Sequence, residues 1–186
     1  MRVLLNLDSK DYDKSLPRTT RNAVRAIILS GGKLVFVKSD KFGEYKFPGG
    51  GAKPGETHCE TIVRETREET GLTVIPSSIR EYGMAREIHK DTLGDGIFEQ
   101  NSYYYLCSVE DGISETLLDD YEREYGYRLV IASADDAISA NAALCDKVEI
   151  PWVRRELLIL RHIRENLSSQ GGMRDAPQVH RDLPGF

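Results

Sequence analysis

The sequence is poor in cysteine and has no long hydrophobic run. Its 186 residues include three cysteines, Cys59, Cys107 and Cys145, which are far apart and form no C-x-x-C pair. Such a set does not suggest a disulfide framework, and it is typical of a reducing compartment. The apolar stretch near the start is too short for a signal peptide, and no segment approaches the roughly 18 apolar residues of a membrane span. We therefore expect a cytoplasmic protein without a membrane partner.

The sequence also lacks an excess of positive charge. Lysine and arginine number 25 against 30 acidic residues, which gives a formal net charge of -5. This balance argues against non-specific binding to nucleic acid, although a local basic pocket for phosphate is compatible with it. With 40% hydrophobic residues, the chain is long enough for one well-packed domain.

Hydrophobic periodicity and turn residues predict a mixed α/β domain over residues 22–167. Residues 1–21 are predicted as an N-terminal strand and extension, and residues 168–186, rich in Ser, Gly, Gln and Pro, as a flexible tail. Within the domain, β-prone runs predict strands at 22–29, 34–38, 72–75, 79–87, 97–109 and 128–131. Helices are expected at 133–144 and 151–166, and an acidic loop at 110–127.

The most informative stretch is a glycine-rich loop that runs into a glutamate-rich segment, residues 50–72. Glu65, Glu68 and Glu69 have i, i+3 and i+4 spacing, so on a helix they project from one side within a turn. Three adjacent carboxylates repel each other. A hard divalent cation with oxygen ligands is their natural partner, so the pattern indicates a metal site.

Both ends of this helix have sequence signals. Thr57 and Glu60 have the spacing of a capping box, and Gly71 is a typical C-terminal stop. Cys59 and Thr66 fall on the arc that should pack on the sheet. The glutamates are expected on a neighbouring arc at the border of the core.

These residues resemble the signature of a known family. Gly50, then five residues, Glu56, then seven, and residues 64–72 (RETREETGL) are similar to the Nudix box, G-x5-E-x7-R-E-U-x-E-E-x-G-U with U apolar. The departure is Thr66 at an apolar position, where we expect a small packing loss. Phe47, Pro48 and Gly49 also resemble the usual lead-in of the family. The resemblance implies a Nudix-type α/β/α sandwich with a mixed central sheet.

The resemblance also implies a metal site. Hydrolysis of a diphosphate needs its negative oxygens neutralised and a water acidified, which Mg²⁺ can do. Glu65 and Glu69 are expected to bind one ion, and Glu68 a second ion or a water. Glu56 is predicted to contribute an outer carboxylate to the metal site, and Gly50 a carbonyl oxygen from the loop. Mn²⁺ is an alternative to Mg²⁺.

The other predicted site residues lie around this cradle. Arg64 is expected to hold Glu68 in its working rotamer. The family often takes its general base from a loop before the last strand, which here means Glu122 or Glu124, with Glu115 as a less favoured alternative. Two tyrosines on one face of a strand are predicted to stack on a base, with sheet-core packing as the alternative, and the phenylalanine beside the glycine loop is a further predicted substrate contact; these are Tyr103, Tyr105 and Phe47.

The sequence therefore predicts a Nudix pyrophosphohydrolase that cuts a nucleoside diphosphate linked to a moiety X with a metal-activated water. A nucleoside or deoxynucleoside triphosphate is the favoured substrate. The alternatives are an ADP-ribose or nucleotide-sugar pyrophosphatase and a non-catalytic Nudix module that senses a nucleotide. The expected partner is a small-molecule nucleotide, with no nucleic acid, and a homodimer is left open.

Overall fold

A mixed sheet of seven strands forms the centre of the molecule in this computed structural model, which describes residues 1–91, 94–145, 147 and 150–169. The strands lie in the order β1-β5-β6-β2-β3-β4, and β7 pairs with β3. They are β1 (Val3–Asp8), β2 (Arg18–Ser30), β3 (Lys33–Ser39), β4 (Tyr45–Lys46), β5 (Arg80–Lys90), β6 (Ile97–Cys107) and β7 (Tyr127–Ala132).

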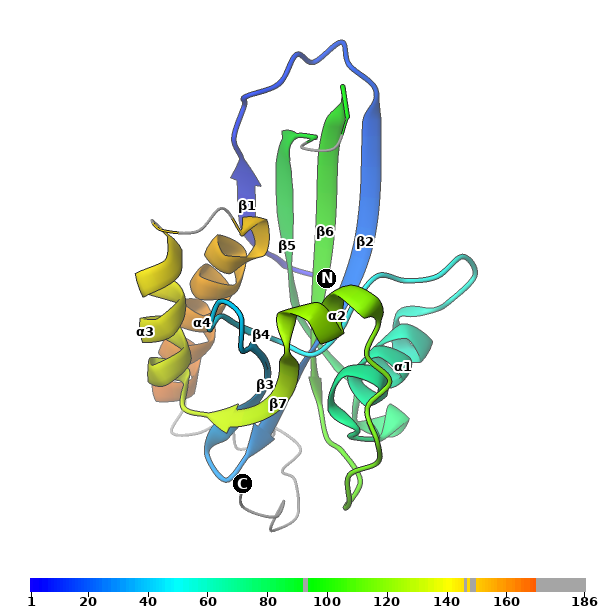
Figure 1. Cartoon of the computed structure of the whole chain (residues 1–186), viewed down its shortest axis with the longest axis vertical. Coiled ribbons are helices and arrows are strands. Elements are labelled where there is room, and N and C mark those ends of the chain that lie inside the picture. The colour runs from blue at the N-terminus through cyan, green and yellow to red at the C-terminus, as the bar shows by residue number, and fades with distance from the viewer. Residues whose placement is uncertain (92–93, 146, 148–149, 170–186) are drawn as a thin grey trace.

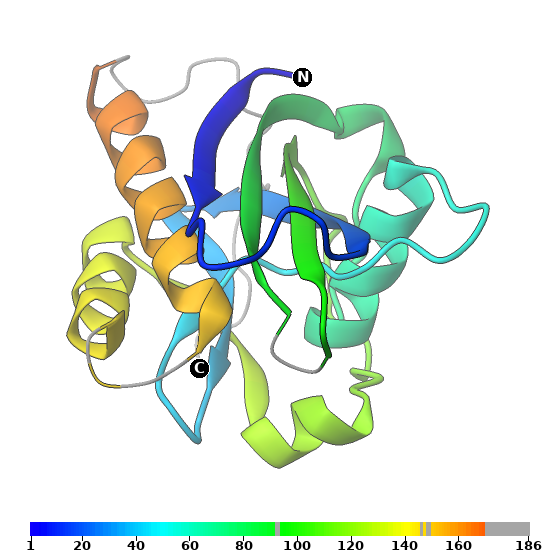
Figure 2. The same ribbon diagram turned by 90° about the horizontal axis from the view of Figure 1, so that it is seen from above.

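Helices cover both faces of the sheet. They are α1 (His58–Thr70), α2 (Asp120–Tyr125), α3 (Ala134–Cys145) and α4 (Pro151–Ser169), with a 3-10 turn, η1 (Pro76–Ser78). In Figures 1 and 2, α1 lies on one side of the sheet and the α3 and α4 pair on the other. This arrangement is the predicted α/β/α sandwich.

The sheet combines parallel and antiparallel pairs. β2 runs parallel to β6, from Arg18 opposite Ile97 to Ile28 opposite Cys107, and β1 runs parallel to β5. β2 and β3 form the predicted hairpin but pair only next to its turn. Beyond that point the edge of β2 is available to another segment, and this positions the functional site.

Alternation along β2 builds a separate core on each face. Val24, Ala26 and Ile28 belong to the cluster on the α1 side, together with Ile62 of the helix. Ile27 belongs to the cluster that includes residues of α3 and α4. The two cores fix both helical layers against the sheet.

The predicted ends of α1 are confirmed. Thr57 and Glu60 form a reciprocal capping box, and Gly71 ends the helix with φ 73°. Thr66 is buried as expected, but its hydroxyl has no hydrogen-bond partner within the described ranges. The prediction for Cys59 is wrong, because its side chain is exposed.

Other differences are local. The strand predicted at 72–75 is reduced to a single bridge between Val74 and Val109, because the chain turns into η1 at Pro76. The predicted acidic loop contains a short helix, α2, and the two-residue strand β4 was not predicted.

The predicted tail mostly lies outside the described residues, and the domain boundaries at 21 and 167 stay predictions. Within the part of the chain that the structure describes, no helix is long and apolar enough to cross a membrane.

Candidate active site

The glycine loop runs along the free edge of β2. The backbone N–H groups of Val24 and Ala26 donate to the carbonyl oxygens of Gly50 and Pro48 at 2.9 and 2.8 Å. Gly49 has φ 134°, and a Cβ there would collide with the carbonyl oxygen of Val24. Only glycine fits this close backbone approach. The loop is therefore held in one position between the sheet and α1.

Arg64 gathers three of the predicted glutamates. Its guanidinium makes two bonds to Glu56, at 2.6 and 2.7 Å, and contacts Glu65 and Glu68 at 2.7 and 2.9 Å. It also donates to the carbonyl oxygen of Gly51 at 3.2 Å. The hydrogen bonds from Arg64 lower the pKa of Glu56 to about 2. Arg64 therefore orients the acidic side of α1 and attaches it to the glycine loop.

Glu65 faces Gly50. A Cβ at Gly50 would overlap the carboxylate of Glu65, so the missing side chain makes room for this group. The side chain of Glu65 is 15% exposed. Burial raises its pKa, and the charge of Glu69 adds to this effect. A second cation beside Glu65 would relieve this cost.

Glu69 is the most deeply buried of the motif carboxylates, with 1% exposure. It accepts hydrogen bonds from the backbone N–H of Gly49 at 2.7 Å and from Lys46 Nζ at 2.8 Å. Burial by itself lowers the pKa of Lys46, but the negative charge of Glu69 raises it, and the pKa of Lys46 is raised overall. The two side chains form a buried ion pair inside the site.

Glu122 reaches the same place from α2. Asp119 caps this helix, and its backbone N–H donates to Glu122 at 3.0 Å. Lys46 Nζ lies 4.0 Å from the Glu122 carboxylate. Burial and the charge of Glu69 raise the pKa of Glu122 to about 7. This carboxylate can therefore hold or release a proton near neutral pH.

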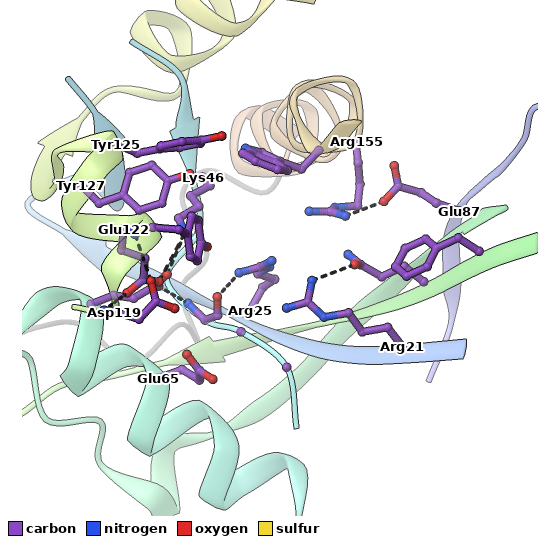
Figure 3. Close-up of a pocket in the computed structure, with 18 of the residues that line it drawn as sticks. Arg21, Arg25, Lys46, Glu65, Glu87, Asp119, Glu122, Tyr125, Tyr127 and Arg155 are labelled. Atoms are coloured by element: carbon purple, nitrogen blue, oxygen red, sulfur yellow. Dashed lines mark hydrogen bonds and ion pairs between the residues drawn. The ribbon is translucent and has the colours of Figure 1, made fainter. Parts of the chain in front are cut away.

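One cavity of about 480 Å³ is lined by Glu65, Glu69, Glu122 and Lys46 (Figure 3). Carboxylates from both helices face it, along with the glycine loop. Four cationic side chains share the lining and come from β2, β4 and α4: Arg21, Arg25, Lys46 and Arg155. Tyrosines from α2 and β7 and the single tryptophan add aromatic surface: Tyr121, Tyr125, Tyr127 and Trp152. The cavity thus combines acid, base and aromatic groups.

The donor chemistry fits a divalent cation. Glu65 and Glu69 supply carboxylate oxygens from adjacent turns of α1, and the burial of Glu65 is costly without a cation. Within the described ranges, no three His, Cys, Asp or Glu side chains form a metal-binding cluster by themselves. Lys46 and Arg64 instead balance these carboxylates. Metal binding would therefore have to compete with the two ion pairs.

Several predicted contacts lie elsewhere. Phe47 is 0% exposed and packs in the core against Phe36, with ring centroids 5.3 Å apart, so its ring cannot meet a substrate. Tyr103 and Tyr105 face α1, where His58 contacts both rings. Burial therefore contradicts the substrate contact of Phe47. Tyr103 and Tyr105 lie outside the lining of the cavity and pack against α1, as in the alternative of sheet packing.

The predicted acids also separate by position. Glu124 is 67% exposed and pairs with Lys41 at 2.6 Å on the surface, so it does not reach the cavity. Glu68 and Glu56 are held by Arg64 at the side of the site, outside the lining of the cavity. The Gly50 carbonyl oxygen, a predicted metal ligand, already accepts one backbone hydrogen bond. Its second lone pair is left for the predicted metal contact.

Sequence reasoning missed the cationic side of the site. Arg25 interrupts an apolar strand, and this lone charge was the one local signal for the cationic side of the site. Arg21 lies four residues earlier, on the same face of the strand. Lys46 and Arg155 gave no signal, because Glu69 and Glu87, with which they pair in the cavity lining, are far away in the chain.

The comparisons with known proteins agree with this geometry. The family model described as "NUDIX domain" matches residues 19–158. A curated relative, "Nucleoside triphosphatase NudI" of Enterobacter sp. (strain 638), is 34% identical over 91 residues, which cover 46% of this chain and 64% of the relative. Mouse "Nucleoside diphosphate-linked moiety X motif 6" is 36% identical over 66 residues, which cover 36% of this chain and 19% of the relative. The chain thus matches less than two thirds of each relative.

Solved structures support the fold. The E. coli ORF135 protein has a TM-score of 0.54 at 19% identity, with 82% of this chain and 94% of that chain covered. A NUDIX hydrolase from Nitrosomonas europaea has a TM-score of 0.53 at 19% identity, with 78% and 90% covered.

Proposed function

Because the chain belongs to the NUDIX domain family, we propose that it is a metal-dependent pyrophosphohydrolase that cuts a phosphoanhydride bond in a nucleotide. The observation that carries the proposal is the meeting of Glu65, Glu69 and Glu122 at one cavity of nucleotide-compatible size. A nucleoside triphosphate is the favoured substrate. The name of the NudI relative supports this choice.

The carboxylates of α1 are assigned to the metal. Glu65 and Glu69 would hold Mg²⁺, or Mn²⁺, which when bound supplies charge neutralisation at the phosphate oxygens and acidifies a water. Arg64 keeps Glu65, Glu68 and Glu56 in position through its hydrogen bonds. Glu68 and Glu56 support the site from its outer side.

Glu122 is assigned as the general base. It lines the cavity near Glu69, with Lys46 close to both carboxylates, so it can take a proton from a water that attacks phosphorus between the two helices. The backbone N–H of Asp119 donates a hydrogen bond to the Glu122 carboxylate and so fixes this side chain. Glu124, which points to the surface, has no part in this step.

The test is product analysis on a panel of nucleotides with Mg²⁺ or with EDTA. We expect nucleoside triphosphates to be cut only with the metal, and Glu69→Gln to lower kcat by about a hundredfold or more. Glu60→Gln is the matched control, since Glu60 lies on α1 outside the cavity and glutamine also serves in a capping box.

Other outcomes identify the alternatives. Faster turnover of ADP-ribose or a nucleotide sugar would replace the triphosphate assignment. Tight nucleotide binding without any turnover would favour the sensing module. A normal rate for Glu69→Gln would overturn the metal assignment.

A further inference from the structure

Two of the four cations that line the cavity have no carboxylate partner. Lys46 and Arg155 each have a carboxylate oxygen within 3.0 Å. For Arg21 and Arg25, the described part of the chain contains no carboxylate within ion-pair distance. Arg21 is exposed and Arg25 is buried, and the two lie on the same face of β2, four residues apart, so they form a pair of cations without an ion-pair partner at one place.

Arg25 is the more costly of the two. It is 7% exposed, and its Nη1 donates to the carbonyl oxygen of Gly49. Its Nε is buried and has no hydrogen-bond partner among the described residues. A buried charge without an ion-pair partner is strongly unfavourable. A protein retains such a group where a ligand supplies the missing charge.

Arg21 adds to this unbalanced charge. Its guanidinium meets only a neutral acceptor, Gln100 Oε1, at 3.4 Å. Partial desolvation of the guanidinium lowers the pKa of Arg21, and the cation of Arg25 lowers it further against a smaller opposite effect of Glu65. Figure 3 shows the guanidinium groups of Arg21, Arg25 and Arg155 directed into the same space. An anion placed there would contact several donors at once.

We propose that Arg21 and Arg25 form an anion subsite for a phosphate group of the substrate next to the bond that is cut, and that this subsite selects triphosphates over nucleotide sugars. The inference rests on the proposed function and specifies its substrate class. Both arginines lie beside Gly49 and Gly51, where the loop also approaches the α1 carboxylates. A phosphate chain that begins at these carboxylates would therefore reach the arginines.

The chemistry of arginine favours this ligand. The planar guanidinium binds phosphate through two parallel hydrogen bonds, and such charge-assisted bonds are stronger than neutral ones. A nucleotide sugar has only two phosphates, and its sugar offers hydroxyl groups at the next position. Hydroxyl groups cannot compensate two cations. The third phosphate of a nucleoside triphosphate can.

The first test is binding without catalysis. Titration calorimetry with tripolyphosphate in EDTA should show binding to the wild-type chain, and Arg21→Gln and Arg25→Lys should each weaken it by about tenfold or more. Arg18→Gln is the matched control, because Arg18 lies on β2 but pairs with Glu99 outside the cavity. Its affinity should stay within a factor of two. Equal affinity in the wild type and both cavity variants would overturn the proposal.

The second test is selectivity. For an active enzyme, Arg21→Gln should lower kcat/KM at least tenfold for a triphosphate and less than threefold for a nucleotide sugar of the same base. Equal losses for both substrates would refute selection. If the chain binds tripolyphosphate through the arginines but hydrolyses nothing, the enzyme proposal fails and the subsite stands. If Arg25→Lys does not fold by circular dichroism, the result for Arg21→Gln decides.

Discussion

Glu69 and Glu122 share one cation, although they belong to different helices. Lys46 Nζ lies 2.8 Å from the carboxylate of Glu69 and 4.0 Å from that of Glu122. The lysine also lies over the ring of Tyr127, 3.9 Å from its centroid. Two buried carboxylates thus share one buried ammonium group. Negative charge therefore predominates at this end of the cavity.

The base assignment predicts different results for two neighbouring glutamates. Glu122→Gln should lower kcat by about a hundredfold or more, since a general base contributes roughly 10²–10⁴ in rate. Glu124→Gln should stay within about twofold, because an exposed ion pair with Lys41 contributes little. Steady-state kinetics on the best substrate of the panel measures both. A normal rate for Glu122→Gln would place the base elsewhere.

The core position of Phe47 predicts a stability effect in place of a binding effect. Phe47→Ala should lower the free energy of unfolding by about 3–5 kcal/mol, the usual cost of removing a buried ring. KM should hardly change for the fraction that stays folded. Urea denaturation and kinetics on the same samples test this, with Phe47→Leu as a milder variant. A raised KM at normal stability would restore the predicted substrate contact.

The buried hydroxyl of Thr66 predicts a stabilising substitution. Valine has nearly the same shape but no polar group, so Thr66→Val removes a hydroxyl that has no partner among the described residues. We expect the free energy of unfolding to rise by about 1 kcal/mol, the low end of the cost of an unpaired polar group. Chemical denaturation measures the change, and Thr66→Ser keeps the hydroxyl as the control. A loss of stability in the valine variant would mean that the hydroxyl is satisfied.

The cross-strand group at Glu99 predicts a pH-dependent stability. Arg86 and Arg18 bind Glu99 at 2.7 and 2.6 Å, and these bonds lower its pKa. Because the folded pKa lies below the unfolded one, Glu99 stabilises the fold above the unfolded value of about 4.3. This contribution is lost as the pH falls through the folded pKa.

The difference in unfolding free energy between the wild type and Glu99→Gln should therefore be largest near neutral pH and shrink in acid. Urea denaturation across a pH series measures it. The same series in an Arg86→Gln background should show a weaker dependence. A difference that grows in acid would contradict the pKa shift.

The local features of this protein were predictable from sequence. The capping box at Thr57, the stop at Gly71 and the helical spacing of Glu65, Glu68 and Glu69 depend on neighbours within a few residues. The hairpin also follows from periodicity and turns, whereas the α/β/α layering was implied by the resemblance to the Nudix family. The family followed from the spaced motif, and the family model matches residues 19–158. The cytoplasmic location, the homodimer and the absence of a nucleic-acid partner stay predictions.

The cavity was decided by the tertiary structure. Sequence alone left Glu122 and Glu124 equivalent, yet the turn of α2 buries one beside Lys46 and exposes the other. It also placed Phe47 and the tyrosines at the substrate, whereas strand alternation and the packing of α1 put them in or beside the cores.

Arg21 and Arg25 became a pair in the lining of the cavity only when β2 separated from β3 and accepted the glycine loop along its edge. Period and spacing determine which residues share a face. Which faces meet depends on contacts between distant segments, and these are not encoded in any local pattern.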